Sequence, residues 1–140
     1  MPRFVLDTDI VSLLQHGHLT VTDHLASYSP DEVATTVITI EEQLSGWYTL
    51  LRRAKTPREL VPVYERLRAA VRFLSKLPLL TFTESAADVY QRLRTQNPRA
   101  GRMDLRIAAI ALAHQATLVT RNLADFQDIE GLLAIDWTRP

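Results

Sequence analysis

The chain has 140 residues and a formal net charge of zero, and 46% of its residues are hydrophobic and 23% charged, which fits one globular domain with a sizeable core. It contains no cysteine and only four glycines, which excludes disulfides, thiolate metal sites, cysteine nucleophiles and glycine-rich phosphate loops. No apolar run approaches the length of a membrane span and no secretion signal is recognisable, so we expect a single domain over residues 1–140, with no membrane partner, in the reducing cytoplasm.

Short apolar strands alternate with helices along the chain. The expected elements, in chain order, are a strand at 3–6, helices at 10–14 and 21–28, a strand at 33–37, helices at 39–51 and 59–77, a strand at 79–82, helices at 83–96 and 104–114, and strands at 117–120 and 132–135. The strands are apolar throughout, which is typical of a parallel sheet covered on both faces. The pattern therefore predicts an α/β fold with a short parallel sheet flanked by helices on both faces.

Polar side chains follow three of the predicted strands. They are Asp7 and Asp9 after the first strand, Glu41 and Glu42 after the second, and Thr120, Asn122 and Asp125 after the strand at 117–120, with Asp104 at a helix start. In open α/β sheets, ligands bind beyond the carboxyl ends of the strands. Carboxylates that converge there repel one another unless a cation neutralises them, and oxygen ligands suit Mg²⁺ or Mn²⁺. Such a site activates water and stabilises charge on a phosphoryl oxygen.

The charges are unevenly distributed along the chain. Residues 1–50 contain one basic and seven acidic residues, whereas residues 51–106 contain thirteen basic and five acidic ones. An acidic metal pocket beside a basic surface is what phosphodiester cleavage requires, because arginine and lysine bind the flanking phosphates. Ordinary solvated helix faces explain the same distribution equally well.

Most of these acids also have a structural explanation. The alternatives are a helix cap for Asp9 before a helix starting at Ile10, the capping box T-x-x-E for Thr39 and Glu42, a favourable first-turn charge for Asp104, and a turn for Asp125. Asp7 is the hardest to explain structurally, because a carboxylate directly after a buried strand needs compensation.

Four segments, in chain order, resemble the motifs of PIN-domain ribonucleases. They are residues 6–12 (LDTDIVS), 37–46 (VITIEEQLSG), 104–113 (DLRIAAIALA) and 120–126 (TRNLADF), the last followed by Gly131 and Asp136-Trp137. The resemblance covers essentially the whole chain and is greatest to the VapC toxins of type II toxin–antitoxin modules. It implies a small PIN-like sheet of four to five parallel strands between helices.

The resemblance also implies roles for individual residues. Asp7, Glu42 and Asp104 are the acidic triad that holds Mg²⁺, for which Mn²⁺ can substitute, and Glu42 rather than Glu41 keeps the family's spacing to the following glycine. The chain departs from the family at the fourth acidic position, which is filled either by Asn122 or by Asp125 in an outer role or on a second metal. The remaining expected site residues are the positioning hydroxyls Thr8 and Thr120 and the RNA contacts Arg121, Asn122, Arg99 and Arg102.

The expected function is therefore a Mg²⁺-dependent endoribonuclease, the toxin of a type II module in the cytoplasm of a bacterium or archaeon, restrained by a VapB-like antitoxin. Residues 47–77 carry more apolar side chains than a small core can bury, so we expect a groove there for an apolar antitoxin segment and another surface for a homodimer. The basic residues near the start of this region, Arg52, Arg53, Lys55 and Arg58, are expected phosphate contacts.

Two alternatives remain open. A phosphatase of the haloacid dehalogenase type would use Asp7 as its nucleophile, but it needs a partner lysine, and neither Lys55 nor Lys76 follows a strand. A catalytically decayed RNA- or protein-binding module would not need the intact triad.

Overall fold

The five strands form one parallel sheet in a computed structural model that describes residues 2–140. The strands are β1 (Phe4–Leu6), β2 (Val33–Thr36), β3 (Leu79–Leu80), β4 (Thr117–Val119) and β5 (Ala134–Ile135). They lie in the order β3-β2-β1-β4-β5, and every neighbouring pair is parallel. The carboxyl ends of β1 and β4, the central pair, therefore lie side by side at one edge of the sheet, where the sequence predicts the site.

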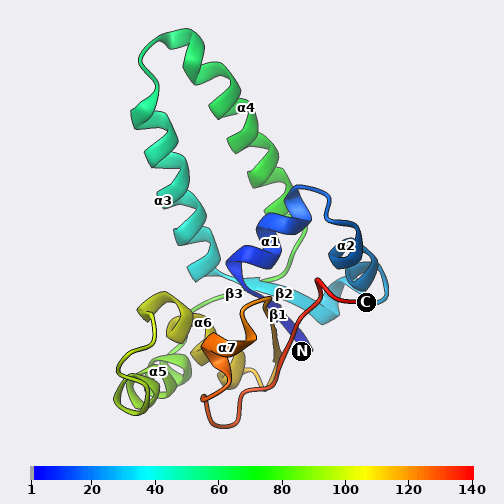
Figure 1. The fold of residues 1–140 in the computed structure, drawn as a ribbon, viewed down its shortest axis with the longest axis vertical. Helices are drawn as coiled ribbons and strands as arrows, with labels where there is room; N and C mark the ends of the chain where they lie inside the picture. Colours follow the sequence, from blue (N-terminus) through cyan, green and yellow to red (C-terminus); the bar gives the residue numbers. More distant parts are fainter. Residues whose placement is uncertain (1) are drawn as a thin grey trace.

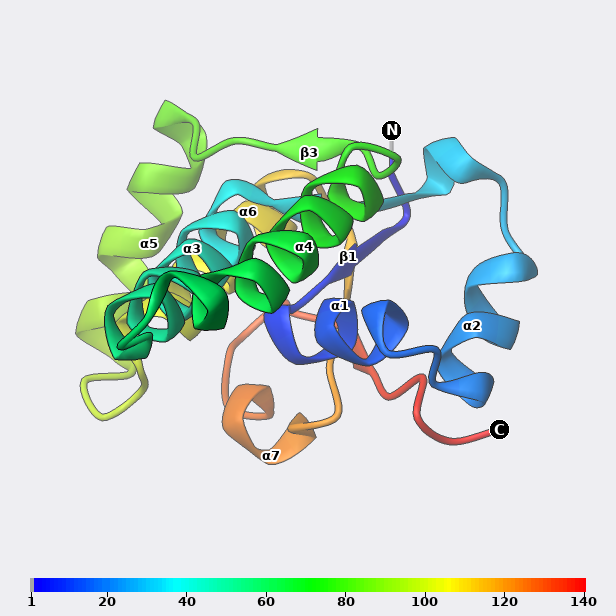
Figure 2. The same cartoon turned by 90° about the horizontal axis from the view of Figure 1, so that it is seen from above.

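Helices cover both faces of this sheet, as predicted (Figures 1 and 2). They are α1 (Thr8–Gln15), α2 (Leu19–Ala26), α3 (Val37–Arg53), α4 (Pro57–Leu74), α5 (Glu84–Gln96), α6 (Arg102–Ala113) and α7 (Leu123–Phe126), with a short 3-10 turn, η1 (Pro30–Glu32), before β2. Because side chains alternate along a strand, Val5 packs into a core with α5 and α6, while Phe4 and Leu6 pack into a second core with α1 and α2. The fold class is confirmed.

The second core is closed by the end of the chain. Trp137 is fully buried, and its ring stacks with the rings of Tyr28 and His24, at centroid distances of 5.7 and 5.6 Å. The imidazole of His24 also hydrogen-bonds the carbonyl oxygen of Arg139 at 2.7 Å. These contacts fix the C-terminal residues against α2, on the face of the sheet that α1 also covers.

Two helices begin at other residues than the sequence patterns indicate. Helix α1 is capped by Asp7, whose side chain accepts a hydrogen bond from the Ile10 amide, so the expectation that Asp9 is the cap is wrong. Helix α3 is capped by Thr36, so Thr39 and Glu42 lie inside the helix and do not form a capping box. Asp9 and Glu42 therefore have no capping role that would explain them without a function.

The other boundaries differ by a few residues, and two elements were not expected. Helix α4 ends at Leu74, three residues before the predicted end, and strands β3 and β5 are only two residues long. The turn η1 and the short helix α7 have no periodic apolar pattern from which to predict them. Among residues 2–140, no helix is both long enough and apolar enough to cross a membrane.

Helices α3 and α4 form a hairpin that projects from the body of the molecule beyond the sheet (Figure 1). Between them lies an apolar groove with a volume of about 270 Å³. It is lined by Ile40, Gln43, Leu44 and Trp47 from α3, by Leu67, Ala70, Val71 and Leu74 from α4, and by Ser75 and Leu79. The expectation of a groove in this region agrees with the structure.

Candidate functional site

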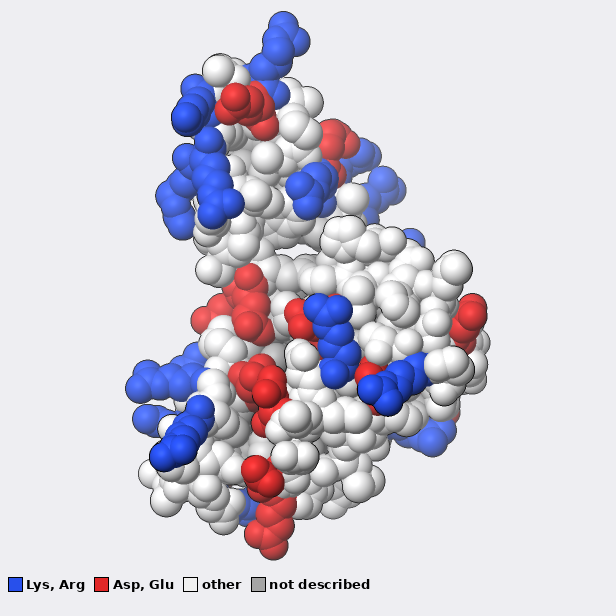
Figure 3. Space-filling model, in the orientation of Figure 1, with Lys and Arg blue, Asp and Glu red and all other residues white. Residues whose placement is uncertain are grey.

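Acidic side chains gather where the hairpin meets the body of the molecule, and Figure 3 shows them as a band on one face. The sheet explains this convergence, because the carboxyl ends of its parallel strands meet at one edge. The contributing residues are Asp7 at the end of β1, Asp9 in the first turn of α1, Glu42 on α3, Asp104 in the first turn of α6 and Asp125 on α7.

Asp7 is the most buried of these acids, with 6% of its surface exposed. Burial is the main reason why its pKa is raised to about 6, and the charges of Asp9 and Asp104 raise it further. The Thr120 hydroxyl and the Ile10 amide, which donates to Asp7 Oδ1 at 2.9 Å, act in the opposite direction. At neutral pH, Asp7 is therefore a charged group in a place that disfavours charge.

Asp104 shows most directly that the acids converge. Its pKa is raised first by burial and then by the charges of Glu42, Asp125 and Asp9. These carboxylates come from three other helices, so their mutual influence means that the fold brings four elements to one crevice. The protein's own groups compensate only part of the repulsion among these acids.

Glu42 is held by the hydroxyl of Thr8, which in turn lies beside the hydroxyl of Thr39. The Thr8 hydroxyl donates a hydrogen bond of 2.5 Å to Glu42 Oε1, and the hydroxyl oxygens of Thr8 and Thr39 lie 3.1 Å apart. Thr8 begins α1, whereas Thr39 and Glu42 lie on α3, so this contact fixes the carboxylate of one helix against the start of the other. The position of Thr8 fits the expected positioning role.

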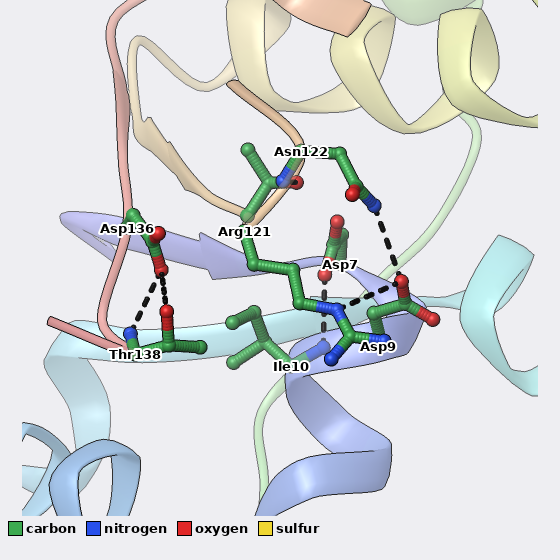
Figure 4. Close-up of polar contacts among 8 residues, drawn as sticks. Asp7, Asp9, Ile10, Arg121, Asn122, Asp136 and Thr138 are labelled. Atoms are coloured by element: carbon green, nitrogen blue, oxygen red, sulfur yellow. Dashed lines mark hydrogen bonds and ion pairs between the residues drawn. The ribbon is translucent and has the colours of Figure 1, made fainter. Parts of the chain in front are cut away.

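Asp9 joins the start of α1 to the turn that follows β4 (Figure 4). Its Oδ2 atom accepts a hydrogen bond from Asn122 Nδ2 at 3.1 Å and lies 3.5 Å from Arg121 Nε. The backbone N–H of Asn122 donates to Thr120 Oγ1 at 3.0 Å, and the Thr120 hydroxyl faces Asp7. Asp9 has no role among those that the family resemblance implies, and its only signal in the sequence is a second carboxylate close after a buried strand.

The remaining expected residues lie at the rim of the crevice. Arg99 and Asp125 line one surface hollow beside Asp128, and Arg102 is the first residue of α6, two positions before Asp104. All of these residues except Asp104, which is partly buried, are exposed. The structure therefore groups Asp7, Asp9, Glu42 and Asp104 closely and places Asp125, Arg99 and Arg102 around them.

The chemistry of the crevice suits a bound cation, because its carboxylates repel one another. No group of three acidic or histidine side chains within residues 2–140 has the geometry of a finished metal cage. Burial contributes most to the raised pKa values of Asp7 and Asp104 and mutual repulsion adds to them; a bound cation would relieve that repulsion. Carboxylate and hydroxyl oxygens suit a hard divalent ion. In their chemistry, the residues present thus fit such an ion.

A nucleophilic aspartate with a partner lysine finds no support at this edge of the sheet. Lys55 lies in the turn between α3 and α4, and Lys76 lies between α4 and the first residue of β3. Because Lys76 precedes its strand, it approaches the amino-terminal edge of the sheet, opposite to Asp7.

Comparisons with known proteins agree with this geometry. The family model "PIN domain" matches residues 4–132. The protein named Ribonuclease VapC2, from Rickettsia felis, is 37% identical over 71 residues, which is 48% of this chain and 53% of that protein, so the match spans about half the length of the curated relative.

Solved structures resemble the whole chain. The crystal structure of VapBC2 from Rickettsia felis, bound to a DNA fragment from its promoter, is 26% identical and has a TM-score of 0.76, covering 96% of this chain and 98% of that one. DNA-bound VapBC from Salmonella typhimurium shares the fold with a TM-score of 0.80 at 23% identity, covering 98% and 99% of the two chains. With the family model matching residues 4–132, this chain belongs to the PIN-domain family.

Proposed function

We propose that this chain is a divalent-metal-dependent endoribonuclease and the toxin of a type II toxin–antitoxin module, acting on RNA in the cytoplasm of a bacterium or archaeon. The observation that carries the proposal is the convergence of Asp7, Glu42 and Asp104 at the carboxyl edge of the sheet, where burial first and then neighbouring charges raise the pKa of Asp104 and Asp7. Membership of the PIN-domain family and the similarity to Ribonuclease VapC2 support the same activity.

Asp7, Glu42 and Asp104 hold the ion in this proposal, and Mg²⁺ is the expected ion, with Mn²⁺ able to replace it. Their oxygens are of the type that both ions prefer. Asn122 stands where many PIN domains carry a fourth acid, and its side-chain amide is bonded to Asp9. We therefore assign the fourth acidic role to Asp125, at the rim, where its charge still reaches Asp104.

Asp7, Glu42 and Asp104 would hold a divalent cation, which would supply an activated water and stabilisation of negative charge on a phosphoryl oxygen. The protein's own groups prepare the site for it. Thr8 holds the Glu42 carboxylate and Thr120 faces Asp7, which fixes the direction of both acids. Because the pKa of Asp7 is raised to about 6, this carboxyl must lose a proton before it binds the ion, so metal binding weakens below pH 6. Arg99 and Arg102 are placed to bind phosphates of RNA that enters from the rim.

The groove between α3 and α4 is the proposed binding site for the antitoxin. It is lined almost entirely by apolar side chains, and a groove of this kind suits an apolar segment of a partner. The structural relatives from Rickettsia felis and Salmonella typhimurium are toxin–antitoxin complexes, which supports a VapB-like partner for this chain. A homodimer through another surface is a separate expectation, and light scattering at high micromolar concentration tests it.

RNA cleavage tests the proposed function. The purified chain should cut single-stranded RNA in Mg²⁺ or Mn²⁺ and should stop cutting in EDTA. Asp104→Asn should abolish cleavage, whereas the control Asp88→Asn, which removes an exposed acid of α5, should leave it unchanged. Cleavage that persists in EDTA, or that survives in Asp104→Asn, contradicts the proposal.

Antitoxin binding is tested by charging the groove. Leu67→Glu should release a VapB-like antitoxin encoded beside this chain, while Val61→Glu, at an exposed position of α4 outside the groove lining, should retain it. Both variants should still cut RNA, because neither lies among the crevice residues. Equal retention by the two variants contradicts the assignment of the groove.

A further inference from the structure

Asp9 carries a charge that the start of α1 does not need. Asp7 caps the helix, so no backbone amide depends on Asp9. The Asp9 carboxylate nevertheless lies close enough to raise the pKa of both Asp7 and Asp104. A fourth acid in a crevice that already suffers from repulsion costs stability, which favours a role other than helix formation.

The described partners of Asp9 both come from the turn after β4. Asn122 Nδ2 and Arg121 Nε approach the same Asp9 oxygen, Oδ2, at 3.1 and 3.5 Å. The contact joins the end of β1 to the end of β4, and the Arg121 side chain reaches from the turn after β4 to Asp9 (Figure 4). Half of the Arg121 side chain remains exposed, and so does 47% of the Asp9 side chain.

The way in which Arg121 is held leaves its binding surface open. The ion pair is formed through Nε, and among residues 2–140 the two terminal nitrogens donate no hydrogen bond. A guanidinium presents its donors as a planar fork that matches two oxygens of a phosphate. Held by Nε at the mouth of an acidic crevice, the fork is free to receive a phosphate that the carboxylates alone would repel.

We propose that Asp9 is a positioning residue, which holds the Arg121 guanidinium over the crevice so that Arg121 binds the RNA phosphate next to the one that is cut. This inference rests on the proposed endoribonuclease function and deepens it by assigning a phosphate subsite. Asn122 donates a hydrogen bond to the same Asp9 oxygen and so ties the turn after β4 to the start of α1.

The change in RNA affinity on removing the Asp9 charge distinguishes this role from two simpler ones. A half-exposed ion pair contributes little to stability. If the pair has no function, the Asp9 carboxylate only repels the phosphates of bound RNA. Replacing that acid by asparagine should then tighten RNA binding. If Asp9 positions Arg121, the same substitution should weaken RNA binding, because the guanidinium loses its anchor. If Asp9 is a metal ligand, the substitution changes the metal dependence of cleavage instead.

The first measurement is RNA affinity in EDTA, by fluorescence anisotropy with a labelled single-stranded RNA oligonucleotide. We expect Asp9→Asn and Arg121→Gln each to weaken binding by about three- to tenfold, and the double variant to be no weaker than Arg121→Gln. Arg121→Lys should restore only part of the affinity, because an ammonium lacks the planar fork. Asp23→Asn, which removes an exposed acid of α2, is the control and should not weaken binding.

The second measurement is RNA cleavage across a Mg²⁺ titration. The positioning role predicts that Asp9→Asn raises KM while kcat and the Mg²⁺ concentration for half-maximal rate stay close to wild type. Tighter RNA binding by Asp9→Asn, additive effects of the two substitutions, or a shifted Mg²⁺ dependence overturns the role of Asp9. Wild-type protein that neither binds nor cuts RNA overturns the proposed function itself, whereas wild-type cleavage with undiminished binding by Asp9→Asn overturns this inference alone.

Discussion

Replacing Asp7 by asparagine should stabilise the metal-free protein at neutral pH. Its pKa rises from an ordinary value of 3.8 to about 6, so ionised Asp7 costs the folded state about 3 kcal/mol. Asparagine keeps the shape and caps a helix as well as aspartate does, so the bond from the Ile10 amide survives. The contact with Thr120 favours the charged form and is already included in this pKa. The expected gain is therefore about 3 kcal/mol.

The pH dependence gives the sign of this effect. Between pH 3.8 and about 6 the unfolded chain has released the Asp7 proton while the folded protein keeps it, so wild-type stability falls as pH rises through that window. The advantage of Asp7→Asn is therefore small near pH 4.5 and complete above pH 7. Urea unfolding in EDTA at pH 4.5 and pH 8 measures it, with Asp7→Ala as the control that also loses the cap, worth about 1 kcal/mol.

The metal reverses the comparison. Mg²⁺ should raise the melting temperature of wild type and leave Asp7→Asn unchanged, because only the carboxylate binds the ion. If Asp7→Asn is less stable than wild type in EDTA at pH 8, or if its advantage is the same at pH 4.5, the burial argument for Asp7 is refuted.

Three further substitutions separate structural from functional roles. Asp104→Asn should be at least as stable as wild type in EDTA near pH 7.5, since burial and neighbouring acids raise the pKa of Asp104; a clear loss in thermal melting would assign it to the helix start instead. Thr36→Ala should cost about 1 kcal/mol in urea unfolding because Thr36 caps α3, and an unchanged stability would contradict that role. Trp137→Ala should cost about 3–5 kcal/mol, and a cost below 1 kcal/mol would show that the C-terminal residues do not close the second core.

The sheet and its helical layers could be predicted because apolar strand runs and helical periodicity repeat along the whole chain. The starts of α1 and α3 were placed at the wrong residues, because such patterns do not determine which residue caps a helix. Asp7 and Asp9 are equally good capping residues, and so are Thr36 and Thr39; which one caps depends on which backbone stays extended at the end of its strand. Thr36 does so, with φ −123° and ψ 160°. That choice is made by strand pairing, which the local sequence does not encode.

The acids of the candidate site could be predicted because the carboxyl ends of parallel strands meet at one edge of the sheet. The link from Asp9 to Arg121 and Asn122 could not, because it joins distant parts of the chain and depends on the side-chain directions of two turns. The local pattern around Asp9 indicates only a helix cap. The roles assigned to Asp7, Glu42, Asp104 and Asp125 stay predictions.

The central claim is that the acidic crevice holds a divalent ion, and crystals soaked in Mn²⁺ test it most directly. Anomalous scattering should place one strong Mn²⁺ peak within coordination distance of carboxylate oxygens of Asp7, Glu42 and Asp104. Crystals of Asp104→Asn treated in the same way should lose that peak. Wild-type crystals with an open crevice and no Mn²⁺ between these three residues would contradict the account.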